Sequence, residues 1–451
     1  MSLGTIIIFF VFLGISIQYR THAQEVQWKL FCMTLFISTF VNCGYAFKVG
    51  SITITYNVWC QILYIAGTVL FVNQKALIIR KKSFYSFFCF GVAIIAGLLI
   101  LKYSNKKPLI IPWTTRMDDV YYQLSKAEYP QIGYGNYLNL FYCIVFVVFL
   151  AMSVRFLYDE TYVVRLIRNI MKFYKIFIVS MITEFFFNNL VSPTLIRTCV
   201  RAVTGIASYG YDAPQKRFGM YGILQLFNES SYFCLFIVLY LLLLVKGVTK
   251  QFNEKWICLS IIALLLSGAT SAWIVIPIAI LAIIKDVLKS STKSGLINVL
   301  IMCAIFCIMA IVLFAVNNEY LSLVISGMAN KVFTYLTGSY DSLAVSGSIR
   351  HMGNQYAYDA FSKSVLFGWG IGTMRSYGLL PSALGCFGVV GLLLIIKYLK
   401  EHCNLGINRK NIIAMIILVA YSSSILSVGY LYDPAIVLIS FPFNVLIWRQ
   451  K

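Results

Sequence analysis

Two arginines stand in polar segments that border long apolar runs. Arg217 lies in the segment Tyr211–Gly222, directly before an uncharged run. Arg350 lies in the segment Ser346–Phe361, within a later polar stretch. A guanidinium stays ionised, and its planar fork can donate two charge-assisted hydrogen bonds to phosphate oxygens. We therefore predict that both side chains bind phosphate groups, the alternative being surface arginines that reach toward lipid headgroups.

A second pair of arginines, Arg197 and Arg201, precedes Arg217 in the chain. Residues four apart share one side of a helix, so one helix would present both guanidinium groups together. The opposite side would be apolar, formed by Leu195, Ile196, Cys199, Val200 and Val203. This pattern predicts a short helix in the membrane interface. We expect the two arginines to bind substrate, with contact to lipid headgroups as the alternative.

The segment around Arg350 has its own helical pattern. A cap at Ser346 or Ser348 predicts a helix that begins near Ile349. Its spacing would put three polar side chains on one face, namely Arg350, Asn354 and Tyr358. An arginine in a first helical turn opposes the helix dipole unless an anion is bound there. We therefore predict that Arg350 meets a phosphate at this helix start and that Asn354 and Tyr358 contribute to substrate binding.

Apolar runs recur along all 451 residues, of which 60% are hydrophobic and 12% are charged. Because about 20 apolar residues cross a hydrocarbon core of about 30 Å, we predict an all-α polytopic membrane protein with about 12–13 transmembrane segments. Residues 1–451 would form a single integral membrane domain with one large loop between late spans. The predicted runs are Ile6–Ile17, Leu30–Phe47, Val58–Ile79, Ser83–Leu101, Tyr137–Val154, Phe173–Val191, Tyr221–Val245, Trp256–Ile284, Leu296–Val316, Leu379–Ile396, Ile412–Tyr430 and Ala435–Ile447.

Lysines and arginines predict the orientation, because short basic loops stay on the inner side. The inner segments would be Arg80–Lys82, Arg155–Lys175, Lys246–Lys255, Lys285–Lys293, Lys397–Lys410 and Arg449–Lys451. This arrangement requires the run Trp256–Ile284 to turn back at Ser267–Ser271. Outer loops would then cover Lys102–Asn136, Ser192–Met220 with Arg217, and residues 317–378 with Arg350. The net charge of +21 reflects this topology and attraction to anionic membrane lipid, and we expect no nucleic-acid partner.

Several motifs together resemble the O-antigen polymerase and ligase family. Arg217 in an outer loop is followed by Asn-Glu229-Ser-Ser at the start of a span. A Ser-Gly-Ala-Thr-Ser break interrupts the next run, and a late outer loop carries Arg350 and then Gly-Trp-Gly-Ile-Gly. The run Leu384-Gly-Cys-Phe-Gly-Val-Val-Gly completes the pattern, which covers roughly Arg197 to Ile396. The glycines of Phe367–Gly372 are not a nucleotide-binding motif, and we expect them to allow a tight return toward the membrane.

The resemblance implies an inverting, metal-independent glycosyl transfer on the periplasmic face of a bacterial inner membrane. The donor would be an undecaprenyl-diphosphate-linked oligosaccharide, and the product O-antigen or capsular polysaccharide. No cofactor is implied, and a chain-length regulator protein would be a further partner. Ligases of this family usually carry a His-Asn pair shortly before the glycine-rich span. This chain has Met374-Arg375-Ser376 there, which favours a polymerase over a ligase.

The implied reaction needs cations for the departing diphosphate and a base for the acceptor hydroxyl. Arg217 and Arg350 are the expected cations. His351, Asp359 and Glu229 are the candidate bases, in that order, although His351 fits a surface residue and Glu229 a structural partner of Arg217 equally well. We expect no metal site, because the chain has no CxxC motif and its three histidines are far apart.

Other residues keep alternative functions open. Glu184 lies within an apolar run, with Asn188 on the same side of a helix, and either function or structural pairing would explain a carboxylate at that depth. Asp118 and Asp119 in the first outer loop would suit a transferase that uses monosaccharide-lipid donors. A lipid-linked oligosaccharide flippase or related transporter is the alternative from another class. Its expected mark, polar residues throughout the spans, is not seen, because charges concentrate in outer loops.

Overall fold

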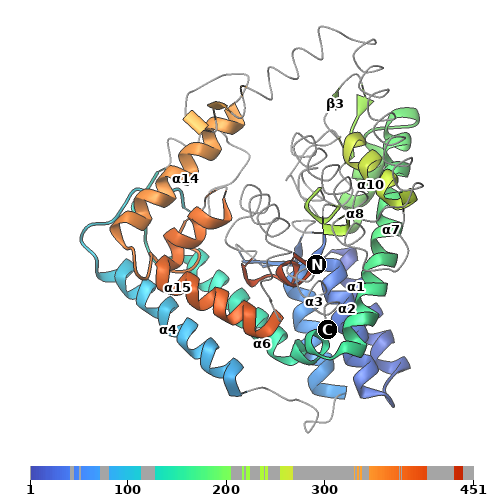
Figure 1. Cartoon of the computed structure of the whole chain (residues 1–451), viewed down its shortest axis with the longest axis horizontal. Coiled ribbons are helices and arrows are strands. Elements are labelled where there is room, and N and C mark those ends of the chain that lie inside the picture. The colour runs from blue at the N-terminus through green and yellow to red at the C-terminus, as the bar shows by residue number, and fades with distance from the viewer. Residues whose placement is uncertain are drawn as a thin grey trace, which may run out of the picture. The chain divides into compact units, whose positions relative to one another are not determined.

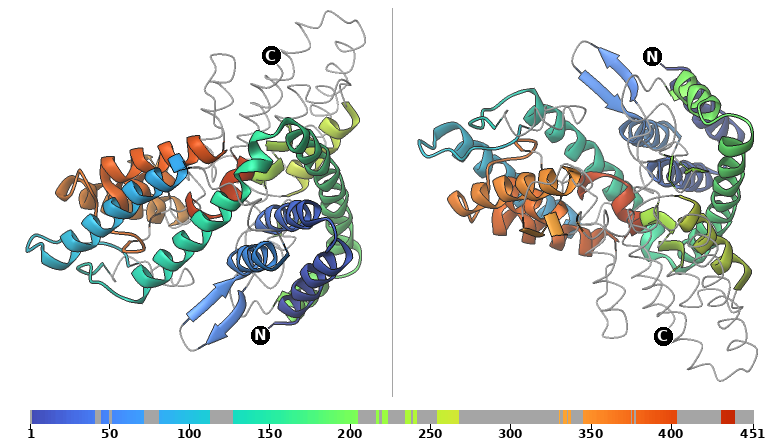
Figure 2. Two further views of the ribbon diagram at one scale, coloured as in Figure 1. Left: turned by 90° about the horizontal axis from the view of Figure 1, so that it is seen from below. Right: turned by 90° about the horizontal axis from the view of Figure 1, so that it is seen from above.

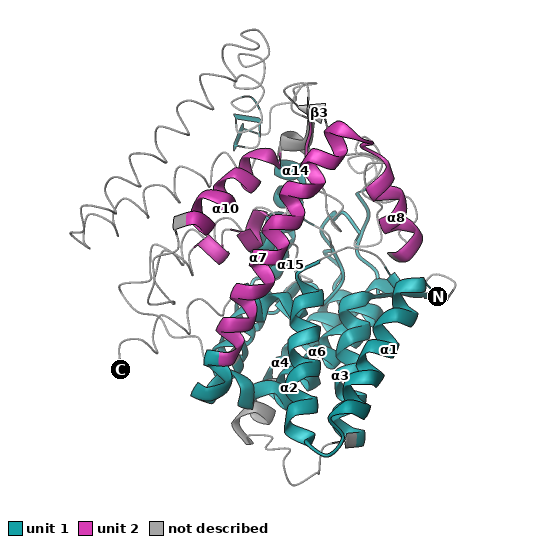
Figure 3. Ribbon diagram, turned by 90° about the vertical axis from the view of Figure 1, so that its right-hand side faces the viewer, with its two compact units in different colours: residues 1–164, 330–447 teal, residues 165–329, 448–451 magenta. Residues whose placement is uncertain are grey.

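The computed structural model describes a defined part of the chain, and the structural statements below concern only that part. It comprises residues 2–40, 45–49, 52–71, 81–112, 127–204, 216–217, 220–223, 234–237, 239–241, 254–267, 330, 333–334, 336–337, 345–374, 376, 378–403 and 431–439. Most of these residues are helical (Figure 1). The chain divides into two compact units, residues 1–164 with 330–447 and residues 165–329 with 448–451 (Figure 3).

Unit 1 contains helices from both ends of the chain. Its elements are α1 Leu3–Gln18, α2 Ala23–Ser38, β1 Tyr45–Val49, β2 Ile52–Thr55, α3 Tyr56–Phe71, α4 Lys81–Tyr103, α6 Tyr134–Tyr158, α14 Val345–Lys363 and α15 Leu379–Cys403. Helix α7, Glu160–Leu190, begins in unit 1 and continues into unit 2. Unit 2 adds α8 Leu195–Thr204, β3 Lys216–Arg217, β4 Met220–Tyr221 and α10 Glu254–Leu266. Among the described helices, Tyr134–Tyr158 and Leu379–His402 are long and apolar enough to cross a membrane.

Aromatic side chains pack where α2, α3 and α6 meet. Trp28 and Phe31 of α2 lie 5.3 Å and 5.2 Å, between ring centroids, from Phe156 of α6. Tyr64 of α3 meets Phe149 of α6 edge to face at 5.0 Å. Such contacts bury large apolar areas in defined geometry and hold the three helices together.

The helices α6 and α15 run parallel, side by side with α4 (Figure 2). At one end, Asn136 of α6 donates to the Ile371 carbonyl just before α15, at 2.7 Å. At the other end, the Tyr158 hydroxyl donates to the Glu401 carbonyl. The end of α6 that carries Arg155 therefore lies with the end of α15 that carries Lys397 and Lys400. This agrees with the predicted placement of both basic segments on one side.

Three predicted boundaries were wrong. The run Leu30–Phe47 is not one span, because α2 ends at Ser38 and the hairpin β1–β2 begins at Tyr45. The helix that contains the predicted run Phe173–Val191 begins earlier, because α7 starts directly after Asp159. Its apolar residues recur at helical spacing and are buried, as Tyr162, Val163, Leu166 and Ile170 show. The run from Tyr221 starts in strand β4, and helical structure is described further along, at 234–237 and 239–241.

Candidate functional site

A glycine-rich segment is inserted into a break in α15. The break lies at Gly388, whose φ is 62°. In a continuous helix, the Val389 and Val390 amides would donate to the carbonyls of Gly385 and Cys386. Those carbonyls instead accept from Trp369 at 2.9 Å and Gly370 at 2.8 Å. The two valine amides donate to the carbonyls of Val365 at 2.8 Å and Leu366 at 3.0 Å. The inserted segment thus supplies partners for these four backbone groups, which the break would otherwise leave without an intrahelical partner.

Glycine is required on both sides of this insertion. A Cβ on Gly388 would lie 2.4 Å from the backbone of Leu366, and one on Gly368 would lie 2.5 Å from that of Cys386. Gly368, Gly370 and Gly372 also have positive φ. The positive φ values fit the tight turn predicted for Phe367–Gly372, whose return toward the membrane stays a prediction. The segment packs onto the second glycine-rich stretch of the predicted family pattern.

Polar side chains tie the inserted segment to the helices around it. Asn136 of α6 donates to the Thr373 hydroxyl at 3.0 Å in addition to the Ile371 carbonyl. The Trp369 indole donates to the Ala360 carbonyl of α14 at 2.7 Å. These bonds position α14, the helix that carries Arg350, against α15.

Helix α14 begins at Val345, so the predicted start near Ile349 was wrong. Ser346 and Ser348 lie inside the helix, and Arg350 lies in its second turn, where the dipole of the helix start no longer supplies a reason for a bound anion. The phosphate chemistry of the guanidinium itself is unaffected.

The polar residues of α14 have different surroundings. Arg350 and His351 are half-buried. Asn354 is 8% exposed and lies in the buried stripe with Ala357, whereas Tyr358 is 45% exposed. Asp359 is exposed as well. The predicted common face is therefore divided between interior and surface.

In unit 2, α7 holds the hairpin that carries Arg217. Asn189 donates to the Tyr221 carbonyl and accepts from the Tyr221 amide, both at 2.8 Å. Asn188 donates to the Gly222 carbonyl at 3.0 Å and to Glu184 at 3.5 Å, in agreement with the predicted proximity of Glu184 and Asn188. Arg217 pairs with Met220 in the hairpin. Sequence reasoning missed Asn189, since an asparagine at a helix end carries no signal for its partner.

Helix α8 forms as predicted, but its arginines face inward. Arg197 is 3% exposed and Arg201 is half-buried. On the apolar side, Leu195 is 47% exposed, Val203 is 37% exposed and Cys199 is exposed. The burial of Arg197 argues against a side chain that merely reaches out to headgroups. A helix with its charged side inward and its apolar side outward is typical of apolar surroundings.

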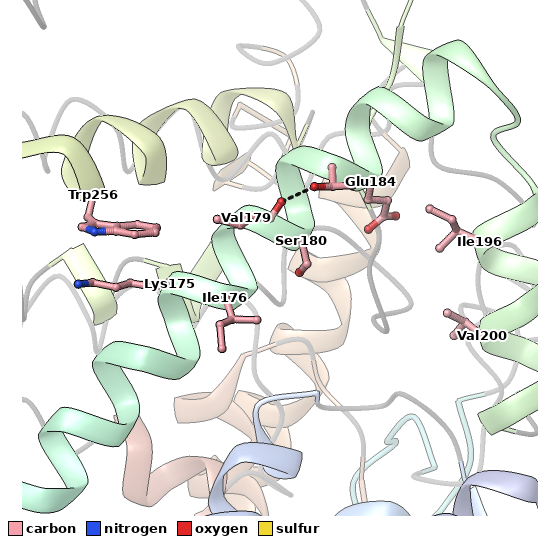
Figure 4. A pocket seen from close by; sticks show the side chains of 9 residues that line it. Lys175, Ile176, Val179, Ser180, Glu184, Ile196, Val200 and Trp256 are labelled. Atoms are coloured by element: carbon pink, nitrogen blue, oxygen red, sulfur yellow. Dashed lines mark hydrogen bonds between the residues drawn. The ribbon is translucent and has the colours of Figure 1, made fainter.

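A pocket of about 590 Å³ lies between α7, α8 and α10. Its lining residues are Lys175, Ile176, Val179, Ser180, Thr183, Glu184, Ile196, Val200 and Trp256. Figure 4 shows Lys175 and Trp256 at one end of it and Glu184 with Ile196 and Val200 at the other. Glu184 is 5% exposed, so the carboxylate predicted at membrane depth is enclosed.

No family model, curated protein or solved structure matches this chain. The family resemblance is therefore supported by the residues alone. Arg217 belongs to unit 2 and Arg350 to unit 1, and their meeting in one site stays a prediction.

Some predicted residues lie outside the described part of the chain. They are Glu229, Asp118 and Asp119, residues 268–271 of the predicted break, Arg375, and the side chain of Arg217. Within the described ranges, α10 ends at Leu266 and Ser267 follows as a turn, as the predicted break requires. No group of three or more His, Cys, Asp or Glu side chains among the described residues could hold a metal ion.

A polar cluster at Asp433 was missed by the sequence analysis. One carboxylate oxygen accepts from the Ala435 amide at 2.8 Å, and the other accepts from Asn57 of α3 at 2.9 Å. The neighbouring Tyr432 hydroxyl donates to Asn139 of α6. Burial raises the pKa of Asp433 from 3.8 to about 6, although both hydrogen bonds oppose this. The Asp433-Pro434 pair before an apolar run is a helix-start signal that predicts the cap but not its partner Asn57.

Proposed function

We propose that this chain is a multi-pass protein of a bacterial inner membrane that polymerises undecaprenyl-diphosphate-linked oligosaccharide repeat units on the periplasmic face. The reaction would be an inverting, metal-independent glycosyl transfer that builds O-antigen or capsular polysaccharide. Two helices long enough to span a membrane, with their basic ends together, support the membrane placement.

The buried guanidinium of Arg197 is the observation that carries the proposal. As the glycosidic bond breaks, negative charge develops on the diphosphate, and without a metal ion the protein must supply fixed cations. Arg197 is 3% exposed on a helix that follows α7, and the hairpin with Arg217 is fixed to α7 by Asn189. Unit 2 thus holds these arginines on elements anchored to one helix. A cation that is already positioned costs no reorganisation during the reaction.

In this proposal Arg350 of unit 1 provides a further cation for the diphosphate. His351, next to it on α14, is the preferred base for the acceptor hydroxyl, because it is half-buried whereas Asp359 is exposed. Asn354 and Tyr358, one turn apart on α14, would contact the sugar.

Two structural features favour a polymerase over the ligase and flippase alternatives. Where ligases carry their His-Asn pair, Met374 is 1% exposed and bridges to Pro112, and the Ser376 hydroxyl bonds the Gly378 carbonyl at 3.1 Å. This segment is thus engaged in structural contacts. Transporters use broken helices whose free ends bind substrate. In α15 those ends are occupied by Val365–Gly370, which counts against a flippase.

Deletion of the coding region followed by gel analysis of surface polysaccharide tests the function. If the protein is a polymerase, the deletion strain should carry lipid A core with one repeat unit attached. A plasmid-borne copy of the gene should then restore the ladder of longer polysaccharide chains. Core without any repeat would instead indicate a ligase or a flippase. A single-repeat band of altered mobility would indicate a monosaccharide transferase, the role for which Asp118 and Asp119 were considered.

A further inference from the structure

One side of α7 changes from basic to apolar along unit 2. Four cations recur at intervals of three or four residues and so share this side, namely Arg165, Arg168, Lys172 and Lys175. Arg168 and Lys172 are exposed, and Lys175 is half-buried. The same side continues with Ile176, Val179 and Thr183, which line the pocket between α7, α8 and α10.

The pocket is open along this side of α7, so it forms a groove. Ile176 is 72% exposed and Val179 is 50% exposed. At its basic end, the Lys175 ammonium lies 5.1 Å from the ring centroid of Trp256 (Figure 4). A tryptophan beside a lysine is typical of the border between headgroups and hydrocarbon. The groove therefore has a basic end, marked by Lys175, and a mainly apolar body that reaches as far as Glu184.

The length of the groove corresponds to one leaflet of a membrane. From Lys175 to Glu184 the helix advances nine residues, or about 13 Å, which is close to half of a hydrocarbon core of about 30 Å. Its volume of about 590 Å³ lies within the usual range of ligand pockets. Cations at one end and apolar lining over half a bilayer match a lipid better than a soluble anion.

We propose that this groove binds an anionic phospholipid, with one acyl chain along Ile176 and Val179 and the headgroup phosphate at Lys172 and Lys175. Arg168 lies one turn further along the basic side and is exposed, so it adds positive charge near the headgroup. Because the basic residues mark the inner side, the lipid comes from the cytoplasmic leaflet. The inference rests on the proposed membrane placement and is independent of glycosyl transfer.

Native mass spectrometry of the purified full chain with phosphatidylglycerol or phosphatidylethanolamine tests the headgroup site. The wild type should retain phosphatidylglycerol preferentially. Lys172→Gln/Lys175→Gln should lower this retention by about tenfold or more, since each cation near an anionic lipid contributes to binding. Lys397→Gln/Lys400→Gln on α15 is the matched control, with the same charge removed, and should retain the lipid. Equal retention of both lipids by the wild type, or equal losses in both variants, would overturn the proposal.

A groove-filling variant tests the acyl chain. Val179→Trp should block the groove and abolish lipid retention, while Val92→Trp on α4 should not, although Val92 is 49% exposed and Val179 50%. Both chains should elute as folded protein in detergent, since the substituted side chains lie at the surface. Soluble glycerol phosphate should not displace the lipid. Unchanged retention in Val179→Trp, or displacement by glycerol phosphate, would overturn the acyl-chain site even if polysaccharide is still polymerised.

Discussion

The side chain of Arg197 is buried, although α8 also has an apolar side that could have been buried instead. Enclosing a guanidinium is costly in apolar surroundings unless it is paired or binds an anion, so this position is not that of an ordinary surface arginine. Arg197 and Arg201 could be singled out from the sequence, because their spacing defines one side of a helix. Which side faces inward could not be predicted, because that depends on whether water or lipid surrounds the helix.

Two substitutions of Arg197 distinguish the effect of its positive charge from that of its planar hydrogen-bonding geometry. Arg197→Ala should lower polymer yield by roughly 10²-fold, as expected when a fixed donor to a developing oxyanion is removed. Arg197→Lys keeps the charge but loses the fork and should restore only part of the yield. Polymer yield is measured from the intensity of the repeat ladder. It is divided by the amount of folded protein, which is determined by size-exclusion chromatography. Wild-type ladders in Arg197→Ala would remove this residue from the site.

The carboxyl group of Asp433 should make stability depend on pH. Its pKa is raised to about 6 in the folded chain, so the native state holds the proton more tightly than the unfolded chain does. The stabilising contribution is therefore complete below about pH 4 and is lost as pH rises through about 6. Asp433→Asn should flatten the change of melting temperature across this window, whereas Asp359→Asn at an exposed position should not. An unchanged pH profile in Asp433→Asn would contradict this account.

Among the elements, the break in α15 is held open by a segment from an earlier part of the chain. Gly388→Ala should destabilise the protein, because positive φ with a Cβ costs about 1–3 kcal/mol and the new Cβ would meet the Leu366 backbone. Gly91→Ala on α4 is the matched control, since a Cβ there meets nothing within 4 Å. It should be neutral or stabilise slightly. The measurement is the melting temperature of each variant in detergent. Equal melting temperatures would contradict the prediction and indicate that α15 can form without the break at Gly388.

Long uncharged runs predict helices well, and α4, α6 and α15 contain the predicted runs within them. The start of α7 was missed because its lysines and arginines suggested a loop, while its buried apolar residues form a helix. Hairpin β1–β2 was missed because its residues continue the apolar composition of α2. The hydrogen bonds between Val365–Gly370 and α15 join two segments that are not adjacent in sequence. The residue pattern of either segment alone does not indicate that the other is its partner. Glycine content alone indicated a tight return of the chain there, without its packing partner.

At the scale of the whole molecule, the parallel course of α6 and α15 leads to a topology prediction. A periplasm-active reporter fused after Gln355 should be active, and one fused after Glu401 should be inactive, because the basic end of α15 lies with that of α6. Reporter activity normalised to expression is the measurement. Activity after Glu401 with none after Gln355 would reverse the orientation and place Arg350 on the cytoplasmic side.

We propose that Arg217 and Arg350 both neutralise the diphosphate of one polyprenyl-linked glycan. The most direct test is the chain-length ladder of surface polysaccharide in strains that carry Arg217→Ala, Arg350→Ala or both. We predict that each single variant leaves only one repeat unit attached and that the double variant resembles either single one, since the two cations serve one leaving group. Long ladders of normal spacing in both single variants would contradict the claim.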